Sequence, residues 1–387
     1  MTAAALLVVT GIVFWLYGAL TARRVLDQLH YHCSFSVQEA SEGDEVMLVE
    51  TVENSGFLPV QWLKVQIFTS RWLDFARTRS VVAQGSRYVN SSFSLSGFEK
   101  ITRRWKVRCL KRGIYRIETV SLTGGALILA ENRSVPVGVG AELIVFPAPI
   151  DLEQWVKPVN MLSGEQIVRR FVLEDPFLVS GAREYRDSDP MNRIHWNASA
   201  RHNKLMVRKN DYTSHMNLRI LLNVQSREQE SIEVLDKEVA ETGIRVAAGM
   251  IRRAMEEGVP VGLATNGLPT DELWKSGSFS GTEGKLSVSA IRSGQNHARN
   301  LMTALAGMRL ETLVGFEELI LSVSRESAGD EVAVITAYAS ARLAFAIHQL
   351  KRNCGRVRII FTQACYIPEE LLAIADIHVL GEAVEQS

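Results

Sequence analysis

The chain has 387 residues, which on usual domain sizes is enough for two or three domains. Its 43 lysines and arginines balance its 43 aspartates and glutamates. This balance excludes a nucleic-acid partner bound by neutralising phosphates, because such binding needs a basic excess. The cysteines have no paired spacing, which indicates reduced thiols in a reducing compartment; they are Cys33, Cys109, Cys354 and Cys365.

The first predicted element is a membrane-spanning helix. Residues 3–20 carry no charge and, at about 1.5 Å per residue, would cross the hydrocarbon core of a bilayer. Arg23 and Arg24 follow at once, and the positive-inside bias keeps that end cytoplasmic. We therefore expect residues 1–24 to be a single-pass anchor in contact with membrane lipid of the cell membrane, with the soluble part in the cytoplasm. A cleaved signal peptide is the alternative, but the basic n-region is missing.

Residues 30–148 predict an antiparallel β-sandwich. Short apolar or alternating runs recur between turns that contain glycine or asparagine, such as the turn at Arg112 and Gly113. His30 and His32 share a face of an extended chain and, with Cys33, resemble half of a zinc site. No second half with suitable spacing follows, so we expect no metal there.

Residues 149–214 form a connecting segment, and the stretch 181–212 is its most informative part. Charged side chains alternate there with aromatic and aliphatic ones, so part of the stretch is expected to be buried. A buried guanidinium needs a partner, and Asp187 and Asp189 are the nearest carboxylates. We interpret the stretch as a buried polar connection between two domains, named here the signature lock. Its residues are Arg183, Tyr185, Asp187, Asp189, Arg193, His195, Trp196, Ser199 and Arg201.

Residues 215–387 predict a doubly wound α/β domain with a mostly parallel sheet. Apolar strands, such as 218–224 and 259–265, alternate with segments of helical periodicity. One predicted helix has its apolar residues at helical spacing; they are Ile232, Leu235, Val239, Val246 and Met250.

The signature lock resembles the signature of a bacterial family known as domain of unknown function 58. The matching residues are Arg183, Tyr185, Asp189, Arg193, Ile194, His195, Trp196, Ser199, Ala200, Arg201, Leu205 and Val207. One departure is Ser188, where the family usually has glycine. The turn at 111–115 also looks like the family's turn in the same place. The resemblance implies a domain similar to von Willebrand factor A in the C-terminal part, but no established activity.

Domains similar to von Willebrand factor A often bind a divalent cation at the end of the first strand. The corresponding loop here contains Asn223, Gln225 and Ser226, so an amide stands where the anchoring carboxylate is expected. Arg227 adds a positive charge, and residues 362–363 lack the distal carboxylate. Without both carboxylates most of the electrostatic attraction is lost. We expect a degenerate loop that holds no metal, and the sequence indicates no other cofactor.

The sequence indicates no enzyme. Thiol dyads could be drawn with Cys109, Cys354 or Cys365, but no nucleophile motif surrounds them, and no phosphate loop is present. The signature of the family that the chain resembles allows aspartate at the position of His195, which favours a structural role for that imidazole. The alternative is an enzyme or anionic-ligand-binding protein in which three arginines of the signature lock bind the anion. These arginines are Arg183, Arg193 and Arg201. An extracytoplasmic adhesin is a third interpretation.

We therefore expect a membrane-anchored interaction or scaffold protein. Relatives in the family are often encoded near MoxR-type AAA ATPases and transglutaminase-like membrane proteins, which implies an adaptor for such an ATPase in cell-envelope processes. In doubly wound folds, binding surfaces lie at the carboxyl ends of the parallel strands. Here those ends correspond to residues 223–228, 266–270 and 362–364.

Overall fold

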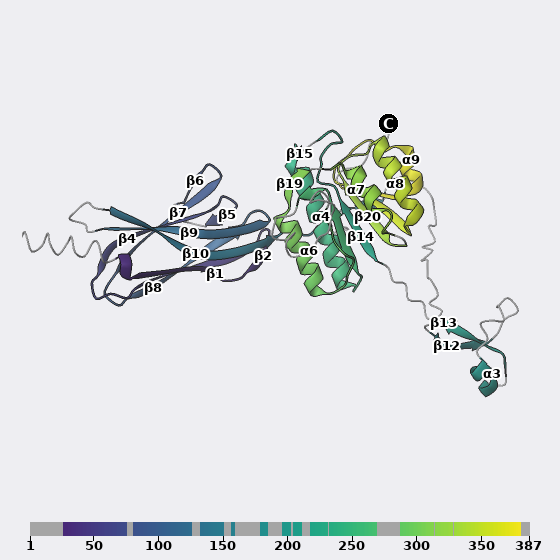
Figure 1. Ribbon diagram of the computed structural model, residues 1–387, viewed down its shortest axis with the longest axis horizontal. Coiled ribbons are helices and arrows are strands. Elements are labelled where there is room, and N and C mark those ends of the chain that lie inside the picture. The colour runs from purple at the N-terminus through teal and green to yellow at the C-terminus, as the bar shows by residue number, and fades with distance from the viewer. Residues whose placement is uncertain are drawn as a thin grey trace, which may run out of the picture.

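The computed structural model describes most of the chain and shows a β-sandwich beside an α/β domain (Figure 1). The residues described are 26–75, 80–125, 132–150, 156–158, 179–184, 196–202, 204–210, 217–230, 232–268, 287–312, 314–327 and 329–380.

The sandwich consists of two sheets that pack against each other. The four-stranded sheet has the order β1-β3-β8-β5, and the six-stranded sheet has the order β2-β10-β9-β4-β7-β6. All pairs are antiparallel except β2 with β10. The bounds are β1 Leu29–Phe35, β2 Glu39–Ser41, β3 Glu45–Asn54, β4 Val60–Ser70, β5 Leu73–Phe75, β6 Ser80–Ala83, β7 Ser86–Leu95, β8 Lys100–Cys109, β9 Gly113–Gly125 and β10 Asn132–Phe146. The 3-10 helix η1 (Leu26–Gln28) precedes β1.

Alternation along these strands builds the sandwich core. In β3 every second residue is buried, because successive side chains of a strand point to opposite faces. Leu48, Val65 and Leu143 come from different strands of the two sheets and are fully buried in the same cluster. The predicted sandwich is therefore consistent with the β-rich fold observed.

The α/β domain is built on a seven-stranded sheet of order β11-β22-β21-β20-β14-β16-β18. The five inner strands are parallel, and the two edge strands are antiparallel to their neighbours. The bounds are β11 Val156–Pro158, β14 Leu218–Leu222, β16 Val261–Thr265, β18 Ser287–Val288, β20 Glu331–Thr336, β21 Arg356–Phe361 and β22 Asp376–Leu380. Strand β11 comes from the predicted connecting segment, so part of that segment belongs to this sheet.

Helices supply a separate apolar cluster to each face of the sheet. Helices α4 (Lys237–Glu256) and α6 (Gln295–Gly307) contribute to one cluster. Helices α7 (Phe316–Val323), α8 (Ala341–Asn353) and α9 (Glu369–Ile374) contribute to the other. Because helices cover both faces, the inner strands are buried almost throughout and are apolar without alternation.

Two smaller sheets complete the described structure. Strands β15 (Ile232–Glu233), β19 (Arg309–Thr312) and β17 (Gly267–Leu268) form a three-stranded sheet. Strands β12 (Val179–Glu184) and β13 (Met206–Asn210) form an antiparallel pair. The short helix α3 (Trp196–His202) comes between them in the chain and lies beside them in Figure 1.

The expected fold class is wrong in its first element. Among the residues that the structure describes, no helix is long and apolar enough to cross a membrane. The stretch 3–20 lies outside those residues, so no N-terminal transmembrane helix is shown. The described chain consists of sandwich sheets and an α/β sheet.

The predicted helix start at Ile232 is also wrong. Helix α4 begins at Lys237, after Asp236, whose side chain accepts hydrogen bonds from the amides of Glu238 and Val239. Ile232 lies instead in β15 with φ at 68°, and its side chain is 66% exposed. A positive φ is costly for a β-branched residue and is incompatible with a helix. The apolar spacing of Ile232 and Leu235 matched a helix by chance, so the predicted helix began before its N-cap at Asp236.

Candidate functional site at the domain junction

The junction between the sandwich and the α/β domain is organised by the turn between β8 and β9. Tyr115 secures this turn, because its hydroxyl donates to the carbonyls of Lys111 (2.6 Å) and Arg112 (3.3 Å). The carboxylate of Glu42 accepts the amide of Arg112 at 2.8 Å. The turn is thus fixed on the sandwich side, and it projects the side chain of Arg112 into the other domain.

The guanidinium of Arg112 is buried and fully bonded within the α/β domain. Its Nε donates to Oε2 of Glu241 at 2.6 Å and its Nη2 to Oε1 at 3.2 Å, a two-pronged ion pair. Its Nη1 donates to the carbonyls of Leu305 (2.5 Å), Ala306 (3.0 Å) and Met308 (3.1 Å). The first two carbonyls lie in the last turn of α6, where a cation satisfies unpaired acceptors and complements the helix dipole.

A second basic residue of the turn also pairs with Glu241. The Nζ atom of Lys111 lies 3.0 Å from Oε1 of Glu241 and 5.2 Å from the ring centre of Trp72. Glu241 is 5% exposed, so it is a buried anion that faces two cations of the sandwich. We name the group Lys111, Arg112 and Glu241 the junction cluster.

Glu42 forms a second ion pair across the junction. Its Oε2 accepts Nε of Arg245, on α4, at 2.9 Å and the amide of Ala148 at 3.1 Å. Burial raises the pKa of Glu42, but the hydrogen bonds from Arg245 and from the amides of Arg112 and Ala148 outweigh it, so the pKa is lowered. The hydrogen bond to Glu42 raises the pKa of Arg245 in turn. Both groups are therefore held in their charged forms.

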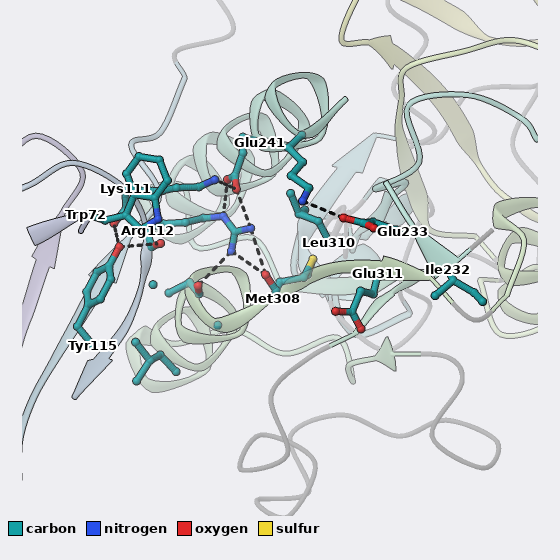
Figure 2. A pocket seen from close by; sticks show the side chains of 15 residues that line it. Trp72, Lys111, Arg112, Tyr115, Ile232, Glu233, Glu241, Met308, Leu310 and Glu311 are labelled. Atoms are coloured by element: carbon teal, nitrogen blue, oxygen red, sulfur yellow. Dashed lines mark hydrogen bonds and ion pairs between the residues drawn. The ribbon is translucent and has the colours of Figure 1, made fainter. Parts of the chain in front are cut away.

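A cavity of about 760 Å³ opens beside the junction cluster (Figure 2). Trp72 and the 111–115 turn line it from the sandwich, and Ile232, Lys237 and Glu311 line it from the α/β domain. The Nζ atom of Lys237 pairs with Glu233 at 3.1 Å. The cavity thus has a wall from each domain, and Arg112 at its base is already occupied by protein partners.

The predicted degenerate loop lies at the carboxyl edge of the sheet, where its amides bond one another. Oδ1 of Asn223 accepts Nδ2 of Asn266 at 2.9 Å and the amide of Gln225 at 3.0 Å. Nδ2 of Asn223 donates to the hydroxyl of Thr336 at 3.1 Å. Nδ2 of Asn266 also donates to Oε1 of Gln225 at 3.0 Å. We name Asn223, Gln225, Asn266 and Thr336 the amide network.

Ser226, the third predicted residue of this loop, is bonded to a buried carboxylate. Its hydroxyl donates to Oε1 of Glu230, and its amide donates to Oε2 of the same residue at 2.7 Å. Among the described residues no three metal-binding side chains of the His, Cys, Asp and Glu types gather together. The amide oxygens that could approach a cation here already accept hydrogen bonds from neighbouring side chains and amides.

The signature lock is described only in part. The side chain of Trp196 is 69% exposed, that of Arg201 is exposed, and Ser199 accepts the amide of Met206 at 2.8 Å. Arg183 lies in β12, and its side chain is outside the described set. Five further residues of the lock lie wholly outside the described residues: Tyr185, Asp187, Asp189, Arg193 and His195. Any contact between the lock's arginines and its aspartates therefore lies outside the described residues, and the predicted lock stays a prediction.

Burial keeps the cysteine thiols protonated. It raises the pKa of Cys109, Cys354 and Cys365 to about 11 and that of Cys33 to about 12. A thiol with such a pKa is almost entirely un-ionised at neutral pH and is a poor nucleophile.

Sequence reasoning missed the junction cluster because its members are far apart in the chain. A signal was present, since Lys111 and Arg112 lie together in a turn that is bounded by Gly113 and that resembles the family's turn. Glu241 gave no signal of its own, because an acidic residue on an amphipathic helix is normally solvated.

The family model described as "Protein of unknown function DUF58" matches residues 181–273. This match supports the resemblance drawn from the signature lock and extends into the α/β domain as far as β17. It does not support the likeness to von Willebrand factor A. No curated protein matches the chain in sequence.

Solved structures match a part of the chain about as long as the sandwich. The CARDB domain of the PF1109 protein from Pyrococcus furiosus is 17% identical, with 30% of this chain and 92% of that chain covered and a TM-score of 0.20. A non-cellulosomal cohesin from Archaeoglobus fulgidus is 14% identical, with 33% and 94% covered and a TM-score of 0.21. At these TM-scores neither likeness bears on function.

Proposed function

We propose that the chain is a protein-interaction scaffold in which the two domains form one unit and the junction cavity receives part of a partner protein. The observation that carries this proposal is the guanidinium of Arg112, which bridges the two domains and whose hydrogen-bonding groups all have protein partners. A cation that bound an anionic substrate would need free donors.

The walls of the cavity suit a protein segment with mixed chemistry. Ile232 offers an exposed apolar side chain, Trp72 offers an aromatic face, and Glu311 offers an exposed carboxylate. Ile232 is also held at a positive φ, and such strain often occurs at functional positions. Aromatic and aliphatic anchors flanked by charges are typical of binding surfaces between proteins.

The partner class that we propose is a MoxR-type AAA ATPase, which the family resemblance suggests. This partner is an association by family and not by geometry. The carboxyl-edge loops 223–228, 266–270 and 362–364, which were the first candidates for docking, are a second surface for the same partner. Asn223, Gln225 and Asn266 of these loops are committed to the amide network, whereas Arg227 and Glu228 are exposed.

The test measures binding of the full chain to a purified MoxR-type ATPase of the same organism, with ATP, with ADP and without nucleotide. We expect Ile232→Asp to weaken binding about tenfold or more, because burying an Ile side chain contributes about 1.5–3 kcal/mol. Phe345→Asp is the matched control, since Phe345 is 62% exposed on α8 and does not line the cavity. Absence of binding, or equal effects of the two variants, would refute the proposal.

A further inference from the structure

Two phenylalanines are exposed at the end of the sandwich that lies opposite the junction. Phe57 is 81% exposed and Phe98 is 72% exposed. They lie on the β3–β4 and β7–β8 connections, whereas Arg112 lies at the other end of β9. In Figure 1 these connections belong to the end of the sandwich that points away from the α/β domain. Two exposed rings presented from neighbouring loops at one end of a domain form a candidate interaction surface.

The two loops are held together by a buried asparagine. Asn54 is 1% exposed, and its Nδ2 donates to the carbonyls of Leu58 at 2.8 Å and Ser96 at 2.9 Å. Its Oδ1 accepts the amide of Gly56 at 3.0 Å. One side chain therefore ties the Phe57 loop to the Phe98 loop, and both rings are presented from a fixed base.

The backbone around Phe98 is specialised as well. Phe98 has φ at 61°, a left-handed conformation that is uncommon for a residue other than glycine. Its amide donates to the carbonyl of Gly56 at 3.0 Å. A side chain at Gly97 would overlap the carbonyl of Phe57, so the two loops approach closely only because this position is glycine. Phe98 therefore combines a left-handed backbone with an exposed aromatic ring.

The first described residues of the chain lie at this same end. The carbonyl of Gln28 accepts the amide of Ser55 at 3.1 Å, so the chain enters the sandwich beside the Phe57 loop. The uncharged sequence 3–20 lies a few residues before that point. The six residues between β9 and β10 at this end read Ala-Leu-Ile-Leu-Ala-Glu. Both stretches of sequence adjoin described residues at the end of the sandwich that carries the rings.

We propose that Phe57 and Phe98 form a lipid-contacting tip that enters the surface of a bilayer. Side chains of this kind bury well at the boundary between headgroups and acyl chains. The described charges nearby show no basic excess, since Lys100 pairs with Glu53 at 3.4 Å, Arg133 with Asp27 at 3.4 Å, and Glu99 adds a carboxylate next to Phe98. The tip therefore binds by apolar burial, and anionic lipid is not required. A bilayer on this end leaves the junction cavity at the other end open to a soluble partner.

The experiment places an environment-sensitive fluorescent amino acid at position 57 or 98 of the full chain, reconstituted with phosphatidylcholine vesicles. Lipids brominated on their acyl chains should quench both positions several-fold more than position 366. Tyr366 is the matched control, because it is 84% exposed on the α/β domain. Equal quenching at positions 57 and 366 would overturn the proposal.

A second measurement removes the rings and leaves the loops intact. Phe57→Ser with Phe98→Asn should lower partitioning into the vesicles by roughly tenfold for each ring. Asparagine suits the left-handed backbone at position 98, and Tyr366→Ser should change nothing. Two other results would overturn the proposal. One is a lipid-free dimer that the double variant dissociates, and the other is a probe at position 57 that is shielded from water before vesicles are added.

Discussion

The junction cluster and the amide network are both buried and polar, yet they use opposite chemistry. The junction cluster joins two domains with full charges, Lys111 and Arg112 against Glu241. The amide network joins loops of one domain with neutral groups, such as Asn223 and Asn266. Buried ions depend on their partners far more than amides do, because an uncompensated charge is costly to desolvate.

This difference indicates what each region does. A charged cluster that is complete only when both domains are in place couples their folding and fixes their relative orientation. A neutral cluster within one domain shapes the end of the sheet without attracting ions. The comparison can be tested by removing one partner from each region.

The largest effect is expected at the junction. Glu241→Ala leaves the guanidinium of Arg112 buried without an anion, and we expect a loss of about 3–5 kcal/mol in the free energy of unfolding. Chemical denaturation of the full chain measures this loss. Glu311→Ala is the control, because Glu311 is exposed on the rim of the same cavity, and it should stay within about 0.5 kcal/mol of the original.

A double variant distinguishes an ion pair from general packing. Arg112→Met with Glu241→Met removes both charges and should destabilise less than Glu241→Ala alone, since apolar replacement of a whole buried pair is often nearly neutral. If the single variant costs less than about 1 kcal/mol, or if the double variant costs more than the single one, the charges do not hold the junction in the way described.

A smaller effect is expected in the amide network. Asn266→Ala removes the acceptor for the amide of Val224 (3.0 Å) and the donor to Asn223 and Gln225. Buried groups left without partners cost about 1–3 kcal/mol, which thermal or chemical unfolding would detect. Gln229→Ala, exposed on a neighbouring loop, is the control. A cost as large as that of Glu241→Ala would contradict the contrast between the two regions.

The sequence predicted much of the fold because its patterns are local. The alternation in β3 and the continuous apolar runs of β14 and β20 indicate their own burial. The start of α4 failed because Ile232 and Leu235 happen to continue the helical spacing, although Asp236 carried the competing signal of a cap. The prediction of a transmembrane helix was based on the uncharged length of residues 3–20 and the arginines that follow, and the structure does not show such a helix.

The site was harder to predict because it depends on the docking of two domains. A buried arginine with a carboxylate partner was predicted in the signature lock, and that prediction stays untested because Asp187, Asp189 and Arg193 lie outside the described residues. At the domain junction the structure describes such an arginine, Arg112, whose partner Glu241 lies far along the chain. No spacing rule connects such a pair. Conversely, Asn223 and Gln225 were recognised at once, because they stand at the end of a strand whose position the pattern fixes.

The smallest effect concerns the second ion pair of the junction and depends on pH. The lowered pKa of Glu42 means that its ionised form is favoured in the folded chain. Its contribution is therefore complete above its unfolded pKa of about 4.3 and is lost as the pH falls through the folded value. Because Arg245 is 34% exposed, solvent screens the pair, and we expect a contribution of about 1 kcal/mol.

Glu42→Gln tests this contribution directly. Glutamine keeps the size of the side chain but cannot ionise, so the difference in unfolding free energy between the original and the variant should be largest near neutral pH and should shrink below about pH 4. Parallel denaturation curves across that range would measure it, with Glu45→Gln, an exposed residue of β3, as the control. A difference that grows as the pH falls would show that burial, and not the hydrogen bonds from Arg245 and the two amides, dominates at Glu42.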